Sequence, residues 1–268
     1  MTSQSSIGLI GYTGFVGGTL LRRGKFNALY NSKNISDIAG HSFDLLVCAG
    51  VSAAKWFANK EPEADRAGIA ALTGCLDKTS IREFILISTI DVYPDPSLPL
   101  DEDHPIDAVG THAYGRHRFE LEQWVAQRFP LARIVRLPAL FGEGLRKNAL
   151  YDLLNDNLVG NIIPNSIFQW YPMRRISADL DIIRRSDLRL VNVFTEPISM
   201  TEIIDRFFPG ARVGQAKSSA PRYSLRTKYA PLFGGANGYA LTKATVLSEM
   251  AHFIAAERRA KHGTPQPT

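Results

Sequence analysis

The sequence predicts an α/β fold, in which a doubly wound parallel sheet is followed by a smaller C-terminal region. Short apolar runs alternate with stretches of helical periodicity, which is typical of a parallel sheet covered by helices on both faces. The first apolar run, residues 7–10, leads directly into a glycine-rich turn and then into a helical stretch. With 268 residues, of which 45% are hydrophobic, the chain is long enough to bury one large core.

The elements follow in order along the chain. Strands are expected at residues 7–10, 26–30, 43–48, 83–89, 133–137 and 190–194. Helices are expected at residues 19–23, 63–77, 113–129 and 242–259. The third helix is the clearest, because four apolar residues between Leu121 and Phe129 share one face and Pro130 ends it.

A change in amino-acid composition and periodicity after residue 141 predicts the domain organisation. From Phe141 onward the chain is richer in Gly, Asn, Pro and Arg, and its periodic pieces are shorter. We expect a first domain over residues 1–141 and a second region over residues 142–268. The strand near 190–194 is expected to return to the sheet of the first domain.

Composition and charge argue against several classes of protein. The net charge of +5 is small and the basic residues are scattered in pairs, so a phosphorylated small molecule explains the charge as well as a nucleic acid does. No nucleic-acid-binding signature is present in the sequence, and we expect no nucleic-acid partner. No apolar run approaches the ~18–20 residues that span a bilayer, and the polar start at residues 1–6 lacks a leader pattern. Cys48 and Cys75 are too few for a disulfide framework. We therefore expect a cytoplasmic protein with free thiols, no membrane contact and no metal site.

The turn after the first strand has glycines at 11, 14 and 17. Glycines at these positions let the backbone approach a pyrophosphate, whose charge is favoured by the free amides and dipole of the following helix. Thr13, Phe15 and Val16 complete this candidate site. The alternative is a tight strand-to-helix turn whose glycines serve packing alone.

A second pattern, formed by residues 87–93 and 114–118, resembles that of a known family. Residues 87–93 read ISTIDVY, residues 114–118 read YGRHR, and Tyr114 lies 25 residues after Thr89. In order and spacing this resembles the extended short-chain dehydrogenase/reductases, the NAD-dependent epimerase/dehydratase family, which have a Rossmann-like fold. The resemblance is strong to about residue 142 and looser beyond. Three later segments also resemble the family, at residues 136–142, 190–193 and 198–204.

The resemblance implies a catalytic group. Thr89 takes the position of the hydroxyl that orients the substrate, Tyr114 that of the acid/base, and Arg118 that of the family's lysine. A nearby cation lowers the pKa of a phenol by favouring the phenolate, and Arg118 can supply that charge. Arginine is forked and keeps its proton, so full oxidoreductase activity is in question. The alternative places Tyr114 and Arg118 as solvated neighbours on one helix face.

The resemblance also implies a dinucleotide cofactor, NAD or NADP, held by residues 1–141. The segment between Gly17 and Val47 is short for the family, but Asp37 and Ile38 resemble its adenine-contacting pair. No carboxylate ends the second strand to bind ribose hydroxyls, and Ser32 with Lys33 favours NADP slightly. The residues expected to contact the cofactor are Gly11, Thr13, Gly14, Phe15, Val16, Gly17, Asn31, Ser32, Lys33, Asp37, Ile38, Ala49, Gly50, Ser88, Tyr114, Arg118 and Leu137.

Residues 142–268 are then expected to bind the substrate, a nucleotide-linked sugar. Family dehydratases have two acidic residues after the threonine, but here Ile90 precedes Asp91, so dehydration is the least favoured reaction. Basic and aromatic side chains suit a sugar diphosphate. The candidates are Arg146, Lys147, Asn148, Trp170, Arg174, Arg175, Arg222 and Arg226.

Together these patterns predict an NAD(P)-dependent epimerase or reductase that acts on a nucleotide-linked sugar. The alternative is a dinucleotide-binding regulator or sensor that has the same fold and has lost redox turnover. The resemblance also implies a possible homodimer that pairs through helices including the one with Tyr114.

Overall fold

The computed structural model describes residues 6–262, so residues 1–5 of the polar start and residues 263–268 lie outside the described part. The chain divides into two compact units. The first contains the chain up to Asp95, Glu102–Leu137 and Ile176–Asn192. The second contains Pro96–Asp101, Pro138–Arg175 and the chain from Val193 onward.

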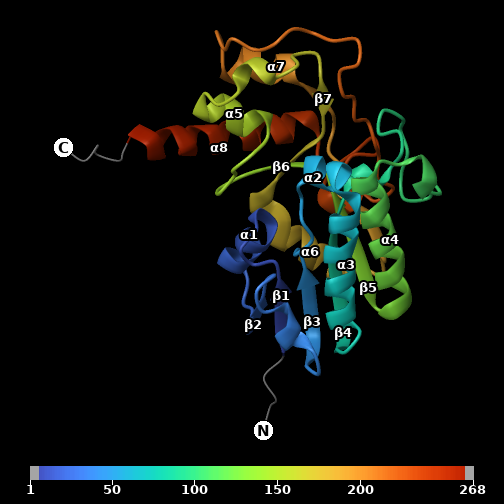
Figure 1. Ribbon diagram of the computed structural model, residues 1–268. Helices are drawn as coiled ribbons and strands as arrows, with labels where there is room; N and C mark the ends of the chain where they lie inside the picture. The colour runs from blue at the N-terminus through green and yellow to red at the C-terminus, as the bar shows by residue number, and fades with distance from the viewer. Residues whose placement is uncertain (1–5, 263–268) are drawn as a thin grey trace. The chain divides into compact units, whose positions relative to one another are not determined.

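The first unit is built on a sheet of six parallel strands in the order β2-β1-β3-β4-β5-β9 (Figure 1). Its strands are β1 (Ile7–Ile10), β2 (Ala28–Tyr30), β3 (Ser42–Cys48), β4 (Ser80–Thr89), β5 (Ala132–Leu137) and β9 (Leu190–Asn192). The order reverses at β1, whose neighbours are β2 on one side and β3 on the other. In sheets of this kind, ligands bind beyond the carboxyl ends of the strands at that point.

Five helices flank this sheet. They are α1 (Phe15–Arg23), α2 (Lys55–Lys60), α3 (Pro62–Leu76), α4 (Ala113–Arg128) and α6 (Ile176–Arg185). Helices α3 and α4 lie side by side along the sheet (Figure 1), while α1 packs against α6. Leu72, Val125 and Phe129 belong to the buried cluster between α3, α4 and the strands. This arrangement confirms the predicted α/β fold.

The pair that resembles the adenine-contacting residues lies in a turn of 3-10 helix. Asp37 and Ile38 lie in η1 (Ile35–Ile38), which precedes β3. Ile38 is fully buried in the core cluster, whereas Asp37 is exposed. The aliphatic member of the pair is used for packing, so only Asp37 is presented at the surface.

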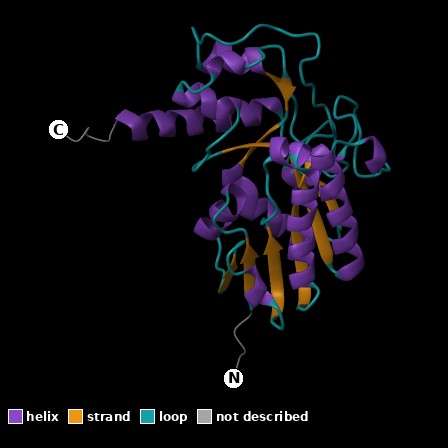
Figure 2. Ribbon diagram, viewed as in Figure 1, coloured by secondary structure: helices purple, strands orange, loops and turns teal. Residues whose placement is uncertain are grey.

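The second unit combines two small sheets with three helices and long loops (Figure 2). Strand β6 (Ala139–Phe141) pairs in parallel with β8 (Trp170–Pro172), and β7 (Ile167–Phe168) pairs antiparallel with β10 (Ile198–Ser199). The helices are α5 (Ala149–Asn155), α7 (Met200–Phe207) and α8 (Lys243–His262). Helix α8 packs against β8 and α5, and Phe253 contacts Phe141 with 5.9 Å between ring centroids.

Within residues 6–262, no helix is long and apolar enough to cross a membrane. Over the same residues, no group of three or more His, Cys, Asp or Glu side chains is placed to hold a metal ion.

Candidate active site

The glycine turn packs backbone against backbone. Gly11 has a φ of +85°, and a Cβ added there would lie 2.5 Å from the carbonyl oxygen of Ala49. A Cβ on Gly17 would lie 2.1 Å from the carbonyl oxygen of Gly11. The Gly11 amide also donates to the Tyr30 carbonyl at 2.7 Å. The loops after β1, β2 and β3 therefore meet at this turn, with no space for side chains between them.

Helix α1 begins at this turn with its first amides uncapped by a side chain. Gly14 is the N-cap and makes no side-chain capping bond. The first turn of a helix has amides without intrahelical partners, and its dipole favours an anion. Thr13 is exposed, and Phe15 and Val16 are half-buried around this end of the helix. A cradle of bare backbone at a helix start fits the pyrophosphate of a dinucleotide.

The loop after β2 lies against the same turn. The Asn31 amide group donates to the Tyr12 hydroxyl at 3.0 Å, and its side-chain oxygen accepts from the Lys33 amide at 2.8 Å. Ser32 and Lys33 are exposed. The pKa of Tyr30, the last residue of β2, is raised first by burial and second by the negative charge of Asp37. Hydroxyl, amide and ammonium groups, which suit a phosphate, therefore line the end of β2.

The structure brings Tyr114 and Thr89 together at the carboxyl end of β4. Tyr114 is buried in the first turn of α4, where its backbone amide donates to Asn59 Oδ1 at 3.0 Å. Its side chain is hydrogen-bonded to Thr89. Leu137 sits opposite Thr89 in the register of β4 with β5. These side chains lie at the same edge of the sheet as the glycine turn, because parallel strands end together there.

Arg118 is held by contacts that sequence reasoning did not anticipate. Its guanidinium carbon lies 4.0 Å from the centroid of the Tyr114 ring. Both Nη atoms bond to the Asp65 carboxylate on α3, and Nη2 also donates to the Ser52 carbonyl at 2.5 Å. Asp65 is 6% exposed and its Oδ2 also lies 2.8 Å from His117 Nδ1. The charge of Arg118 is therefore balanced by a buried carboxylate.

Burial and nearby charges act in opposite directions on the pKa values of this cluster. Burial by itself raises the pKa of Asp65, but hydrogen bonds from Arg118 and His117 bring it below its ordinary value. Burial is the largest influence on the pKa of Tyr114 and raises it, while Arg118 lowers it and Asp91 raises it. The effect of Arg118 therefore has the direction that the sequence predicted, but the pKa of Tyr114 still lies above its ordinary value. Burial outweighs a cation that is already paired.

Sequence reasoning missed Asp65, although a signal was present. Asp65, Ile69, Leu72 and Leu76 occupy positions i, i+4, i+7 and i+11, so a carboxylate begins the apolar face of α3. An acidic residue on a buried face needs a cationic partner. Ser88 is also placed differently from the other cofactor candidates, because its hydroxyl donates to Glu122 in a buried network.

The candidate substrate residues of the second unit differ in how they are held. Asn148 caps α5 by accepting from the amides of Leu150 and Tyr151. Trp170 is buried, and Arg174 pairs with Glu249 of α8. Arg226 lies over the Tyr239 ring at 4.1 Å. Several of these side chains thus have structural contacts within their own unit.

No family model matches the chain, and a search of curated proteins found no match. Solved structures do match over nearly the whole chain. MoeE5, solved with UDP-glucuronic acid and NAD, superposes with a TM-score of 0.74 at 16% identity, over 96% of this chain and 100% of that one.

Two further structures extend this likeness. A dTDP-4-dehydrorhamnose reductase from Clostridium acetobutylicum has a TM-score of 0.71 at 15% identity, over 94% of this chain and 99% of that one. A UDP-galactose 4-epimerase has a TM-score of 0.68 at 16% identity, with the same coverage. The chain therefore shares its α/β fold with these structures.

Proposed function

We propose that this chain is an NAD(P)-dependent enzyme that epimerises or reduces a nucleotide-linked sugar. The observation that carries the proposal is the position of the Thr89–Tyr114 pair at the same sheet edge as the bare glycine turn. The fold is shared with structures that were solved with UDP-sugars and NAD or that are named as sugar-nucleotide epimerases and reductases. The first unit would hold the dinucleotide and the second the sugar.

The dinucleotide, when bound, supplies or accepts a hydride. Gly11, Gly17 and the start of α1 would hold its pyrophosphate, and exposed Ser32 and Lys33 favour NADP over NAD. Tyr114 holds its proton more tightly than an ordinary tyrosine. A tyrosine placed as acid/base can give its proton to a carbonyl oxygen or take one from a sugar hydroxyl, so the site serves both reduction and epimerisation.

Replacing Tyr114 by phenylalanine is expected to lower kcat about 100-fold or more, since the substitution removes the proton donor and leaves the ring. Dinucleotide affinity should change less than about 2-fold, because the pyrophosphate cradle is built from other residues. The assay follows nicotinamide absorbance with dTDP-4-dehydrorhamnose as the probe for reduction. Chromatography of the products from UDP-glucose and UDP-glucuronic acid detects epimerisation, which returns its hydride to the sugar. Tyr151→Phe, on α5, is the matched control and should keep the activity of the wild type.

A second candidate function is a dinucleotide-binding protein without redox turnover. It is favoured by the pairing of Arg118 with Asp65, because a guanidinium fixed in this way does not exchange protons as a lysine does. If wild type and Tyr114→Phe both bind NAD or NADP and neither changes any probe, this second function replaces the first.

The free thiols of Cys48 and Cys75 suit a reducing compartment, and we place either function in the cytoplasm.

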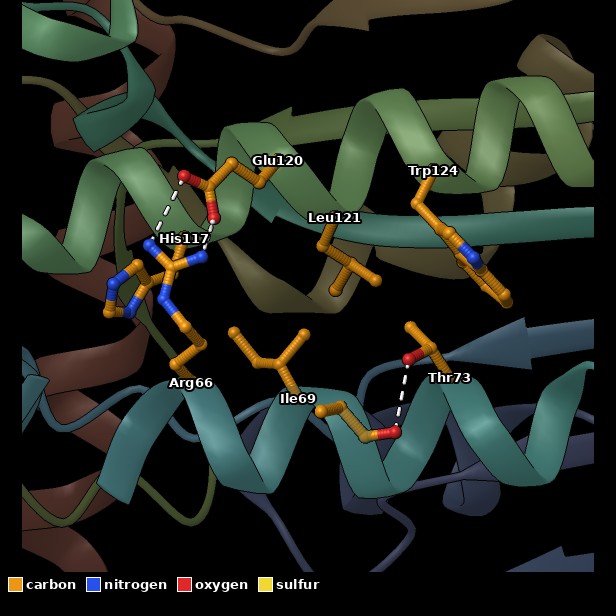
Figure 3. A pocket seen from close by; sticks show the side chains of 8 residues that line it. Arg66, Ile69, Thr73, His117, Glu120, Leu121 and Trp124 are labelled. Carbon is orange, nitrogen blue, oxygen red and sulfur yellow. Dashed lines mark hydrogen bonds and ion pairs between the residues drawn. The ribbon is translucent and has the colours of Figure 1, made fainter. Parts of the chain in front are cut away.

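We also propose that two copies pair through α3 and α4. A shallow pocket between these helices is lined by Ile69, Leu121 and Trp124, and Arg66 is bonded to Glu120 at 2.7 Å at one end of it (Figure 3). A surface that carries both charges beside apolar groups is self-complementary under a two-fold axis.

Ala70→Arg should convert such a dimer to a monomer, because Ala70 is exposed and lines this pocket. Sedimentation velocity measures the change, and Ala71→Arg, on an exposed position of the same helix outside the pocket, is the control. A wild-type monomer at all concentrations would contradict the pairing.

A further inference from the structure

Lys55 brings an ammonium group toward the Tyr114 site from a separate element. It is the first residue of α2, in the segment that follows β3, and its Nζ lies 2.8 Å from Oδ1 of Asp91. The Asp91 side chain is 15% exposed, whereas that of Lys55 is 40% exposed. The pair thus joins a mostly buried carboxylate to an ammonium that remains in contact with solvent.

Asp91 connects this pair to Tyr114. The backbone amide of Asp91 donates to Thr89 Oγ1 at 3.2 Å, and the Thr89 hydroxyl is hydrogen-bonded to Tyr114. Helix α4 packs directly against η2 (Ile90–Val92), which contains Asp91. The charge on Asp91 therefore acts at short range on the start of α4.

His112, at the start of α4, has a pKa that depends on the charges of Lys55 and Asp91. It is the N-cap of α4, and its Nδ1 accepts from the Gly115 amide at 3.0 Å. Burial is the largest influence on the pKa of His112 and lowers it; Lys55 lowers it further and Asp91 raises it. The charges of Lys55 and Asp91 thus have opposite effects on the pKa of His112, which lies two positions before Tyr114.

Arg118 differs from Lys55 in both contacts and exposure. Arg118 is 4% exposed and is bonded to Asp65 and to the Ser52 carbonyl. Lys55 keeps contact with solvent and pairs with Asp91, whereas Arg118 is enclosed by its partners.

We propose that Lys55 is a positioning residue of the Tyr114 site. It acts through Asp91: the Lys55 ammonium offsets the negative charge of the Asp91 carboxylate, which otherwise opposes the loss of a proton from Tyr114. The importance of this role for turnover rests on the proposed function, but the charge coupling itself does not. The groups that face Tyr114 are Thr89, Asp91, Arg118 and Asp65. Those that face His112 are Lys55, Asp91, Arg118 and Tyr114, whose ring centroid lies 6.2 Å from that of the imidazole.

The sign of the effect follows from charge. Without Lys55, the Asp91 carboxylate is no longer offset, and a negative charge favours the protonated forms of both His112 and Tyr114. Lys55→Met should therefore raise the pKa of each group, by roughly 0.5 to 1 unit for an incompletely buried neighbour. Asp91→Asn, which removes the carboxylate while Lys55 stays, should lower both.

The experiment is a titration of the full chain without substrate. The His112 midpoint is followed by NMR of the imidazole carbons, assigned by loss of the signal in His112→Gln. Lys55→Met is compared with Lys60→Met, which removes an exposed ammonium from the last position of the same helix, and with Lys55→Arg, which keeps the charge. The expected result is an upward shift in Lys55→Met alone, which corresponds to a roughly 3- to 10-fold gain in proton affinity.

An unchanged midpoint in Lys55→Met, or an equal shift in Lys60→Met, overturns the proposal. If Lys55→Met fails to fold, the downward shift in Asp91→Asn decides the matter in its place. Because the titration needs no turnover, it stands even if no sugar is converted, and that failure would count only against the proposed function. If the wild type is active with Tyr114 as its proton donor, the alkaline limb of its kcat profile should move to higher pH in Lys55→Met.

Discussion

Gly17→Ala is expected to abolish binding of NAD and NADP in calorimetric titration, with affinity falling at least about 100-fold. The added Cβ would lie 2.1 Å from the Gly11 carbonyl oxygen, 2.6 Å from the Gly11 carbonyl carbon and 3.0 Å from the Tyr12 Cα. All three are backbone atoms that no rotamer change can move away. The turn must open, and the cradle that fits a pyrophosphate is lost with it.

Gly18→Ala is the matched control. A Cβ at that position meets the Tyr12 carbonyl oxygen at 3.4 Å and the end of the Arg22 side chain at 3.7 Å, which are ordinary contacts. Alanine within α1 should even stabilise the helix by several tenths of a kcal/mol to about 1 kcal/mol. If Gly17→Ala binds either dinucleotide as the wild type does, while circular dichroism shows an intact fold, the turn is not the binding site.

The fold could be predicted because its signals are local. The strand pattern of residues 7–10, the spaced glycines after it and the amphipathic helix ending at Pro130 are each visible within a short window. The spacing of Thr89 and Tyr114 predicts a common site, and in the structure the Thr89 side chain lowers the pKa of Tyr114, while their catalytic roles stay a prediction. Such features need no knowledge of distant contacts.

Charge balance could not be predicted in the same way. Arg118 is separated from Asp65 by 53 positions, and only the packing of α4 on α3 brings the two together. Lys55 and Asp91 are likewise 36 positions apart. Whether a cation changes the pKa of Tyr114 depends on its partners and on burial, and neither is contained in local spacing.

Ile38 shows the same limit for a binding residue. Its place after Asp37 suggested a contact with adenine, but its complete burial depends on how η1 is covered by α3. A short motif identifies residue types, whereas the tertiary structure decides which of them face solvent.

Glu122→Ala is expected to destabilise the fold by about 3–5 kcal/mol, because it leaves the Arg136 guanidinium buried without its counter-charge. Arg136 on β5 is 2% exposed, and its Nη2 lies 2.6 Å from Glu122 Oε2 on α4. Burial by itself lowers the pKa of Arg136, but Glu122 and the Tyr93 hydroxyl, which accepts from Nη1 at 3.0 Å, raise it above its ordinary value. The folded state therefore depends on the pair as a unit.

The network extends across neighbouring strands, which explains the size of the expected effect. Ser88 on β4 donates to Glu122, and Asn192 on β9 donates to the Tyr93 hydroxyl at 2.7 Å. Urea denaturation of Glu122→Ala measures the loss, and the double variant Glu122→Leu/Arg136→Met is the control. Removing both charges with apolar groups of similar volume costs far less than removing one, often close to nothing. A loss below about 1 kcal/mol in the single variant, or an equal loss in both, would show that the buried charge does not hold the sheet to α4.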